Sequence, residues 1–339
     1  MIATPNIPQI SGLSFEAQDK ILDNSKLLYG FVLNEDGPVT STHRVAQFKD
    51  PASQTLLYSP EETSGEIEVF STQSKPDLAY IRKGWSERAA MSRQSATLVT
   101  PGEHRIPTMD KMDAHALHLF GRFQVPCATF HIEPEDLMPS ESFRRAVAAA
   151  LLQPNETAKF HELQNTLSKF GHVLATRLEM GLSLCTTRKI PFKSIEDQIL
   201  QEGEMKVQFL ELLHSAVKNP SASTEKINVY TRGGNPGVLP GLDIISWLST
   251  VQDPTNWMVI GVSSVVPTIS ILDEPLRSSV QALIASAHSM QLLQPPPIFH
   301  LPHRFTQRYE LLLVCCTFFE MTPILGARGR NPWGSWRHL

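Results

Sequence analysis

Three histidines are the side chains best suited to hold a metal ion: His115, His118 and His131, at the ends of one apolar stretch. Imidazole is a common ligand of zinc and other transition metals. The stretch itself predicts a strand, and in a strand a three-residue offset puts two side chains on opposite faces. We therefore expect no metal site here, and histidines that are solvated or that cap neighbouring backbone.

Carboxylates gather just after this stretch, at Glu133, Glu135 and Asp136. Such a group could bind calcium or pair for acid–base chemistry, but a solvated connector is the simpler interpretation. The chain contains none of the short motifs of nucleophile elbows, phosphate loops, zinc peptidases or dinucleotide sites. Gly233 and Gly234 lack the third glycine of a phosphate cradle. The sequence thus predicts no catalytic residue, no cofactor and no metal, and hence no enzyme.

The composition further limits the classes of protein to which this chain can belong. The 339 residues are 41% hydrophobic and 19% charged, with a formal net charge of −4, so a sizeable core is expected and a nucleic-acid partner is not. The N-terminus lacks the basic and apolar regions of a signal peptide. The longest apolar run, residues 311–319, is far shorter than the roughly 18 residues of a membrane helix. We expect four buried free thiols, at Cys127, Cys185, Cys315 and Cys316.

Hydrophobic periodicity and breakers predict an α+β protein with most of the chain in one domain. Ser140 is a credible N-cap for a helix over 141–152, and a second helix should end at Gly171. Pro126, inside a strand, indicates a bulge or bend. Long strands are expected near residues 77–99, 115–132, 172–190 and 256–272. We divide the chain into an N-terminal segment (1–76), a core (77–286) and a proline-broken extension (287–339).

Two stretches carry a resemblance to a known family. Residues 233–283 contain a Gly-Gly turn, a short helix with Trp247, then Trp257 and an apolar run. Upstream, Phe170-Gly171 at a helix end leads into a strand that contains Gly181. Both stretches, in this order, resemble the fungal version of the membrane attack complex/perforin (MACPF) domain over roughly residues 115–285. The chain departs from the family's usual pattern at His172-Val173 and at Gly181-Leu182.

The resemblance implies a bent four-stranded antiparallel sheet flanked by helical clusters. It implies hinge or sheet-bend roles for Gly171, Gly181, Gly233 and Gly234, beside the signature residues Phe170, Trp247 and Trp257. It also implies a pore-forming, toxin-like action in which monomers oligomerise on membrane lipids, with or without a separate lipid-binding partner protein. Two helical segments, near 87–113 and 191–230, would then become transmembrane hairpins.

Alternation along the second segment places Met205, Val207, Phe209 and Leu213 on one candidate membrane-inserting face. Alternation is lost after this stretch, and the first segment is short, rich in Arg and Glu, and broken by Pro101 and Pro107. Two functions therefore stay open: a perforin-like protein that inserts hairpins, and a non-lytic scaffold or interaction protein on the same fold. A basic-aromatic tail with Trp333 and Trp336 could touch a membrane interface, but a disordered end is the simpler interpretation.

Overall fold

The computed structural model describes ten stretches of the chain: residues 7–8, 10–34, 36–50, 57–59, 67–86, 88–90, 116–191, 193–218, 229–235 and 244–292. The chain forms two compact units, Met1–Ser289 and Met290–Leu339. Apart from the last residues of one helix, every element discussed below belongs to the first unit. The tail with Trp333 and Trp336 and the cysteines at 315 and 316 lie outside the described residues.

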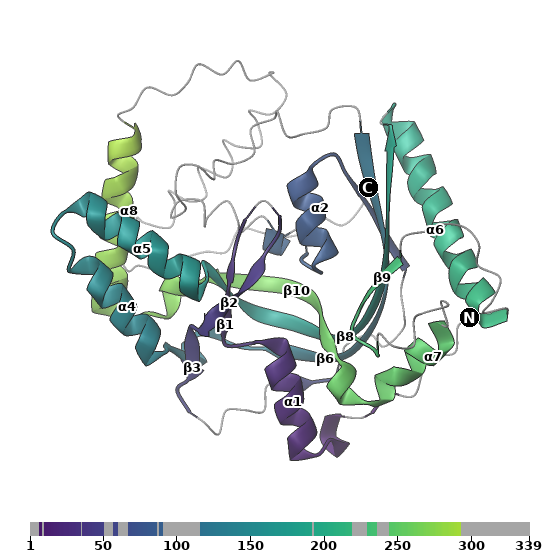
Figure 1. Cartoon of the computed structure of the whole chain (residues 1–339), viewed down its shortest axis with the longest axis horizontal. Helices are drawn as coiled ribbons and strands as arrows, with labels where there is room; N and C mark the ends of the chain where they lie inside the picture. Colours follow the sequence, from purple (N-terminus) through teal and green to yellow (C-terminus); the bar gives the residue numbers. More distant parts are fainter. Residues whose placement is uncertain are drawn as a thin grey trace, which may run out of the picture. The chain divides into compact units, whose positions relative to one another are not determined.

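Two long antiparallel strands, β6 (Ala116–His131) and β8 (Val173–Pro191), form the centre of the sheet (Figure 1). The far edge of β6 carries two short strands, β4 (Leu57–Tyr58) and β5 (Ile67–Thr72). Strand β8 pairs successively with β10 (Met258–Pro267) and β9 (Val229–Arg232), both antiparallel. The sheet is therefore four strand positions wide, and each outer position is filled by two segments.

The N-terminal part of the chain extends this sheet. Strand β1 (Tyr29–Val32) pairs with the first residues of β8 and carries β2 (Val39–Arg44). A separate two-stranded sheet joins β3 (Ala46–Phe48) to β7 (Leu137–Pro139). Because β1, β4 and β5 pair with β8 and β6, the sequence-based boundary between residues 76 and 77 does not separate two structural parts.

Both faces of the sheet are covered where β5, β6, β8 and β9 run together. Helix α2 (Lys75–Arg82) packs Leu78 and Ile81 on one face, in a cluster with Phe120 and Cys185. Helix α6 (Ile195–Lys218) covers the other face, where Met205 joins a cluster with three sheet residues, Leu117, Leu119 and Ile190. Figure 1 shows α2 and α6 on either side of the strands. Burial on both faces explains why β6 is apolar along most of its length.

The expected strand over 77–99 is wrong, because α2 occupies its first residues. Ser74 accepts a hydrogen bond from the backbone N of Asp77 (3.2 Å), and Pro76 stands in the first turn, which is a favourable helix start. The outer strand is instead β5, whose alternation is visible in the sequence at 66–70. The last expected strand, 256–272, ends at Pro267, where a 3-10 helix η8 (Thr268–Ile271) follows.

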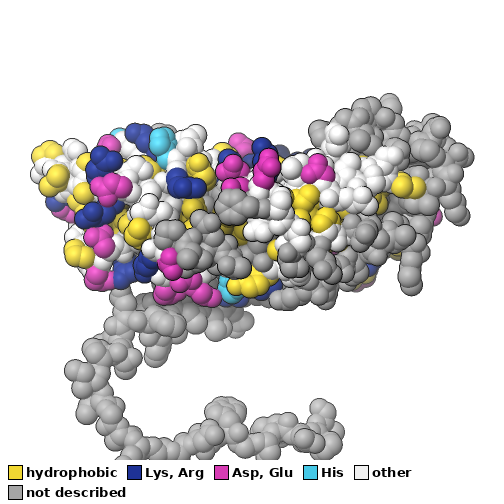
Figure 2. Space-filling model, turned by 90° about the horizontal axis from the view of Figure 1, so that it is seen from below, with side chains coloured by type: hydrophobic (Ala, Val, Ile, Leu, Met, Phe, Trp, Pro, Cys, Tyr) yellow, Lys and Arg dark blue, Asp and Glu magenta, His cyan; other side chains and the backbone are white. Residues whose placement is uncertain are grey.

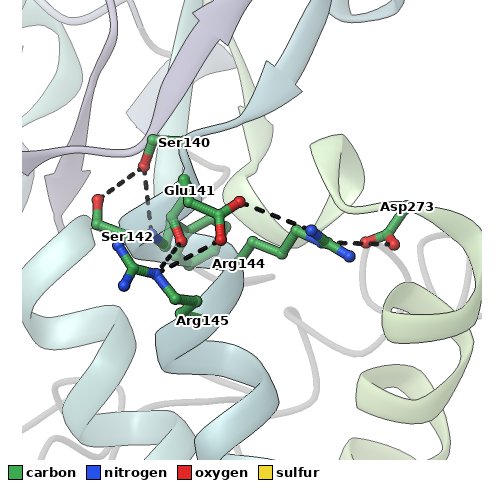
Figure 3. Close-up of polar contacts among 7 residues, drawn as sticks. Ser140, Glu141, Ser142, Arg144, Arg145 and Asp273 are labelled. Carbon is green, nitrogen blue, oxygen red and sulfur yellow. Dashed lines mark hydrogen bonds and ion pairs between the residues drawn. The ribbon is translucent and has the colours of Figure 1, made fainter.

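Of the remaining described helices, the one at residues 15–25 is not expected from the sequence, whereas those that begin after Ser140, end at Gly171 and contain Trp247 are. These helices are α1 (Phe15–Ser25), α4 (Glu141–Leu151), α5 (Glu156–Phe170), α7 (Ile244–Ser249) and α8 (Glu274–Leu292). Ser140 caps α4 by accepting from the backbone N of Phe143 (3.2 Å), and it donates to the carbonyl of Arg44 (2.7 Å). At the same end Arg144 reaches Glu141 (3.6 Å) and Asp273 (3.8 Å), so it links the start of α4 to the residue before α8 (Figure 3).

Seen from below, the described surface alternates hydrophobic side chains with acidic and basic ones (Figure 2). Within the described residues, no helix is both long enough and apolar enough to cross a membrane. Cys127 and Cys185 are free and buried, as the sequence predicts. Burial raises the pKa of both thiols, so both are protonated near neutral pH.

Candidate functional site

The sheet changes its pairing at Gly181, in the middle of β8. Gly181 is the last residue of β8 that pairs with β10, and Ser183 is the first that pairs with β9. On the other edge, β6 has a bulge between Pro126 and Ala128, directly opposite Gly181 and Met180. Both neighbours of β8 therefore break register at this point, and of the bulge or bend that Pro126 predicts, the bulge is confirmed.

Glycine is required at Gly181 by backbone contact. A Cβ atom there would lie 2.1 Å from the carbonyl oxygen of Val125 in β6. A Cβ on Gly233 would in turn lie 2.4 Å from the carbonyl oxygen of Gly181. Gly233 has φ of 71°, a left-handed angle that favours glycine. Three backbone segments thus meet here at distances that leave no room for a side chain.

Two tryptophans complete this contact. Trp247 is fully buried, and its Nε1 donates to the carbonyl of Gly233 (3.2 Å). A Cβ on Gly234 would collide with the same indole at 2.2 Å. Trp257, also fully buried, donates from Nε1 to the carbonyl of Val251 (2.8 Å). We call Gly181, Gly233, Gly234, Trp247 and Trp257 the bend cluster.

Phe170 and Gly171 form a second contact, away from the bend cluster. Gly171 ends α5 with φ of 98°, and Gly30 of β1 packs against it so closely that a Cβ on Gly30 would lie 2.2 Å from the carbonyl oxygen of Phe170. Gly171 and Gly181 are ten positions apart along a nearly extended segment, a distance of about 33 Å. The predicted hinge residues therefore form two sites. Gly30 is not among the residues that the sequence pattern singles out, although a glycine inside a strand can mark such a close approach.

His172, one of the departures from the family pattern, holds this second site together. Its backbone N donates to the carbonyl of Phe31 (2.8 Å), and its Nδ1 accepts from the backbone N of Leu33 (3.0 Å). Thr268 at the start of η8 donates from Oγ1 to the carbonyl of Gly171 (2.8 Å). The start of β8 is thus tied to β1 on one side and to η8 on the other.

Helix α6 lies in the second of the two segments that the family resemblance implies to be helical, near 191–230. Met205 and Phe209 are 4% and 1% exposed and point at the sheet, one helical turn apart. Gly121 of β6 makes room for them, since a Cβ there would lie 3.4 Å from Met205 Cε. Gln198 donates from Nε2 to Ser71 Oγ of β5 (2.6 Å), and Ser71 donates to Glu202. One face of α6 is therefore held by two apolar anchors and one polar contact.

The four candidate membrane-inserting residues do not share a face in this helix. Val207 is 53% exposed, on the side away from Met205 and Phe209. Alternate residues share a face only in a strand, whereas a helix brings positions three and four apart together. The side chain of Leu213 lies outside the described residues, as does most of the first candidate segment, 87–113.

The candidate metal ligands are not brought together. His131 is half-exposed and pairs with Glu133 (3.2 Å), His118 is buried, and His115 lies outside the described residues. Within the part of the chain that the structure describes, no three His, Cys, Asp or Glu side chains are grouped closely enough to hold a metal ion.

A cation next to the bend cluster, Arg232, forms no ion pair with an acidic side chain of the described residues. Nη1 of Arg232 is buried and makes no hydrogen bond to any residue that the structure describes. It lies against Gly84, where a Cβ would be 3.3 Å away. Burial lowers the pKa of Arg232, and burial together with Arg232 lowers the pKa of Lys83. Arg232 thus keeps one buried nitrogen without a hydrogen bond to a described residue, and such a group costs folding free energy.

Replacing Arg232 with methionine, which has a similar length, should stabilise the protein. The variant removes the buried charge and keeps most of the packing, so we expect the free energy of unfolding to rise by about 1–3 kcal/mol in urea titrations. Arg122→Met is the matched control. Arg122 pairs with Glu68 at 2.5 Å, so its removal should bring no gain. A less stable Arg232→Met protein would contradict this account.

A bent sheet four positions wide, with helices on both faces and glycines at its bend, is the α+β architecture of a MACPF-type protein. The chain belongs to the fungal MACPF-like family, whose domain model matches residues 27–280. No curated protein sequence matches this chain.

Three solved structures have similar folds. A MAC/perforin-domain protein of Bacteroides thetaiotaomicron is 14% identical over 84% of this chain and 62% of its own, with a TM-score of 0.42. GNIP1Aa of Chromobacterium piscinae is 10% identical over 80% of this chain and 56% of its own, with a TM-score of 0.42. The vertebrate perforin-like membrane protein Astrotactin-2 is 11% identical over 77% and 44%, with a TM-score of 0.39. The chain spans less than two thirds of each of these proteins.

Proposed function

We propose that this chain is a perforin-like protein, without enzymatic activity, that oligomerises on membranes and inserts α6 as part of a β-hairpin. The observation that supports this function most is the pairing of β8 and β9 next to α6. Ser183 pairs with Arg232, and Thr186 with Val229, in an unbroken register. Both strands lead directly into the segment that contains α6.

Extending this register gives a hairpin of defined geometry. Residues 192–228 lie between β8 and β9. If pairing continues residue by residue, Val207 and Gln208 meet at the turn and each strand gains about fifteen residues beyond the present sheet. A tilted transmembrane strand needs about 9–11 residues, so the length is sufficient.

The first strand of this hairpin would be amphipathic. Ile195, Ile199, Met205 and Val207 would share one face, which suits lipid except at Asp197. The opposite face would be largely charged and suited to a water-filled lumen, with Glu196, Glu202, Glu204 and Lys206.

One observation favours the alternative, a non-lytic scaffold or interaction protein. In the extended register Phe209 and Leu213 pair with Lys206 and Glu202, and they therefore fall on the charged face. The return strand is thus less suited to lipid than the first, and the four candidate inserting residues would not share a face.

A reversible tether between α6 and β5 distinguishes the two functions. Cysteines replace Ser71 and Gln198, whose side chains are in contact, in a background in which Cys315 and Cys316 are serine. A thiol-cleavable bis-methanethiosulfonate reagent joins the two cysteines. Dye release is then measured from liposomes of phosphatidylcholine with phosphatidylserine, sphingomyelin or sterol. We expect release from the untethered protein, loss of release on tethering, and recovery after reduction.

The control carries the same tether within α5, at Glu156 and Lys159, which form an ion pair at 3.0 Å. This helix is not expected to unfold, so its tether should leave release unchanged. No release from any liposome by the untethered protein, with a monomer throughout, would favour the non-lytic scaffold.

A further inference from the structure

Helix α6 has a second apolar face, which points away from the sheet. Ile199, Leu200, Val207 and Leu210 are 64%, 58%, 53% and 37% exposed, whereas most aliphatic side chains of the described core are buried. Gly203 lies between them, and a Cβ at this position would have nothing within 4 Å. We call these five residues the outer face of α6. Four exposed aliphatic side chains on one helix are the kind of surface that a partner covers.

The spacing of the outer face is that of a helix–helix seam. Leu200, Gly203, Val207 and Leu210 follow one another at intervals of three, four and three residues, which are the a and d positions of a heptad repeat. Gly203 leaves a hole in this seam, into which a large side chain of a facing helix can insert. The seam extends over about two heptads, enough to hold one short helix.

The charges that border the seam are mostly acidic, with Lys206 as the basic residue on its other side, and they select the partner. Asp197, Glu204 and Glu211 are seven residues apart and form an acidic row along one side of it. Such a row attracts a helix with lysine or arginine beside its own apolar seam. It opposes a second antiparallel copy of α6, because the two acidic rows would face each other, and it opposes anionic lipid headgroups.

We propose that the outer face of α6 is a docking site for a basic amphipathic helix of a partner protein. The site does not depend on pore formation, since it needs only the helical form of α6. Where both hold, the docked helix keeps residues 199–210 helical and opposes their extension into a hairpin. The partner would then inhibit membrane insertion of α6.

A designed peptide tests the site directly. The probe is a labelled 21-residue helix with leucine at all a and d positions and lysine at e and g, titrated with the full chain and followed by fluorescence anisotropy. We expect binding to the natural chain and a loss of about tenfold or more in affinity for Val207→Glu. The double variant Glu204→Lys, Glu211→Lys should show a similar loss. A second probe with glutamate at e and g should bind at least about tenfold more weakly than the first.

Leu152→Glu is the control variant, because Leu152 is 84% exposed and lies just after α4, outside the proposed site. It should bind the lysine probe as the natural chain does. Circular dichroism and thermal unfolding of each variant establish that α6 and the fold are retained. Absent binding, equal binding of both probes, or unchanged affinity of Val207→Glu would overturn the proposal. Self-association of the chain that Val207→Glu abolishes would assign the face to a second copy instead and would overturn it too.

Discussion

Gly181→Ala should destabilise the protein by at least about 3 kcal/mol, and it is expected to prevent folding at physiological temperature. The added methyl group would lie 2.1 Å from the carbonyl oxygen of Val125, an atom of the neighbouring strand's backbone. Strand β8 cannot move away from Val125 at this point, because Gly233 packs against the carbonyl of Gly181. The clash can therefore be relieved only by separating β6 from β8 or by displacing the Gly233 turn. Urea unfolding, or the soluble yield where the variant does not fold, measures the effect.

Gly203→Ala is the matched control for this prediction. Gly203 lies in the interior of α6 with open space around it, so alanine should raise the free energy of unfolding by up to about 1 kcal/mol through its better helix propensity. The same chemical change should thus have opposite signs at the two positions. Similar stabilities of the two variants would show that Gly181 does not make the close contact described above.

Phe209→Ala should cost about 3–5 kcal/mol of stability wherever α6 remains coupled to the sheet. The ring is 1% exposed and, with Met205, fills the space over Gly121. Val207→Ala, two residues away on the exposed side, should change stability by less than about 0.5 kcal/mol. If α6 detaches without global unfolding, the loss appears instead as faster proteolytic cleavage within residues 195–218. Both variants are therefore measured by urea unfolding and by limited proteolysis.

If Phe209→Ala and Val207→Ala changed stability and proteolysis equally, α6 would not pack on the sheet through Phe209. The expected difference also has a functional consequence under the proposed function. Weaker anchoring favours release of α6, so Phe209→Ala should reach half-maximal dye release sooner than Val207→Ala in the liposome assay. The opposite order would indicate that loss of an apolar side chain impairs insertion more than loss of anchoring promotes release.

Local signals in the sequence were enough for the elements with strong caps and periodicity. Ser140 and the apolar spacing after it predict α4, and Gly171 marks the end of α5. These features depend on contacts within a few residues, such as the backbone N–H that Ser140 caps, and such contacts are encoded locally.

The segment after β5 combines a local signal, the Ser74 cap, with a contact to distant residues. The weakly apolar residues 77–85 are compatible with a strand or a helix by pattern alone, and the cap from Ser74 and packing against Phe120 favour α2. A short apolar segment takes the structure that buries its side chains best, and the surface available for burial is made by distant residues. The outer strand is therefore β5, which precedes the expected segment, residues 77–99, in the sequence.

By itself, the sequence determined the class of the protein and the order of its signature residues, and for residues 195–218 it left both a helix and a hairpin open. Only the tertiary structure decided which glycines meet, because Gly181 touches Gly233 across 52 residues and Gly171 touches Gly30 across 141. It also decided which face of α6 is anchored and which is free. Contacts of this kind depend on how whole strands and helices pack, and no pattern within one segment specifies the surface that it will meet.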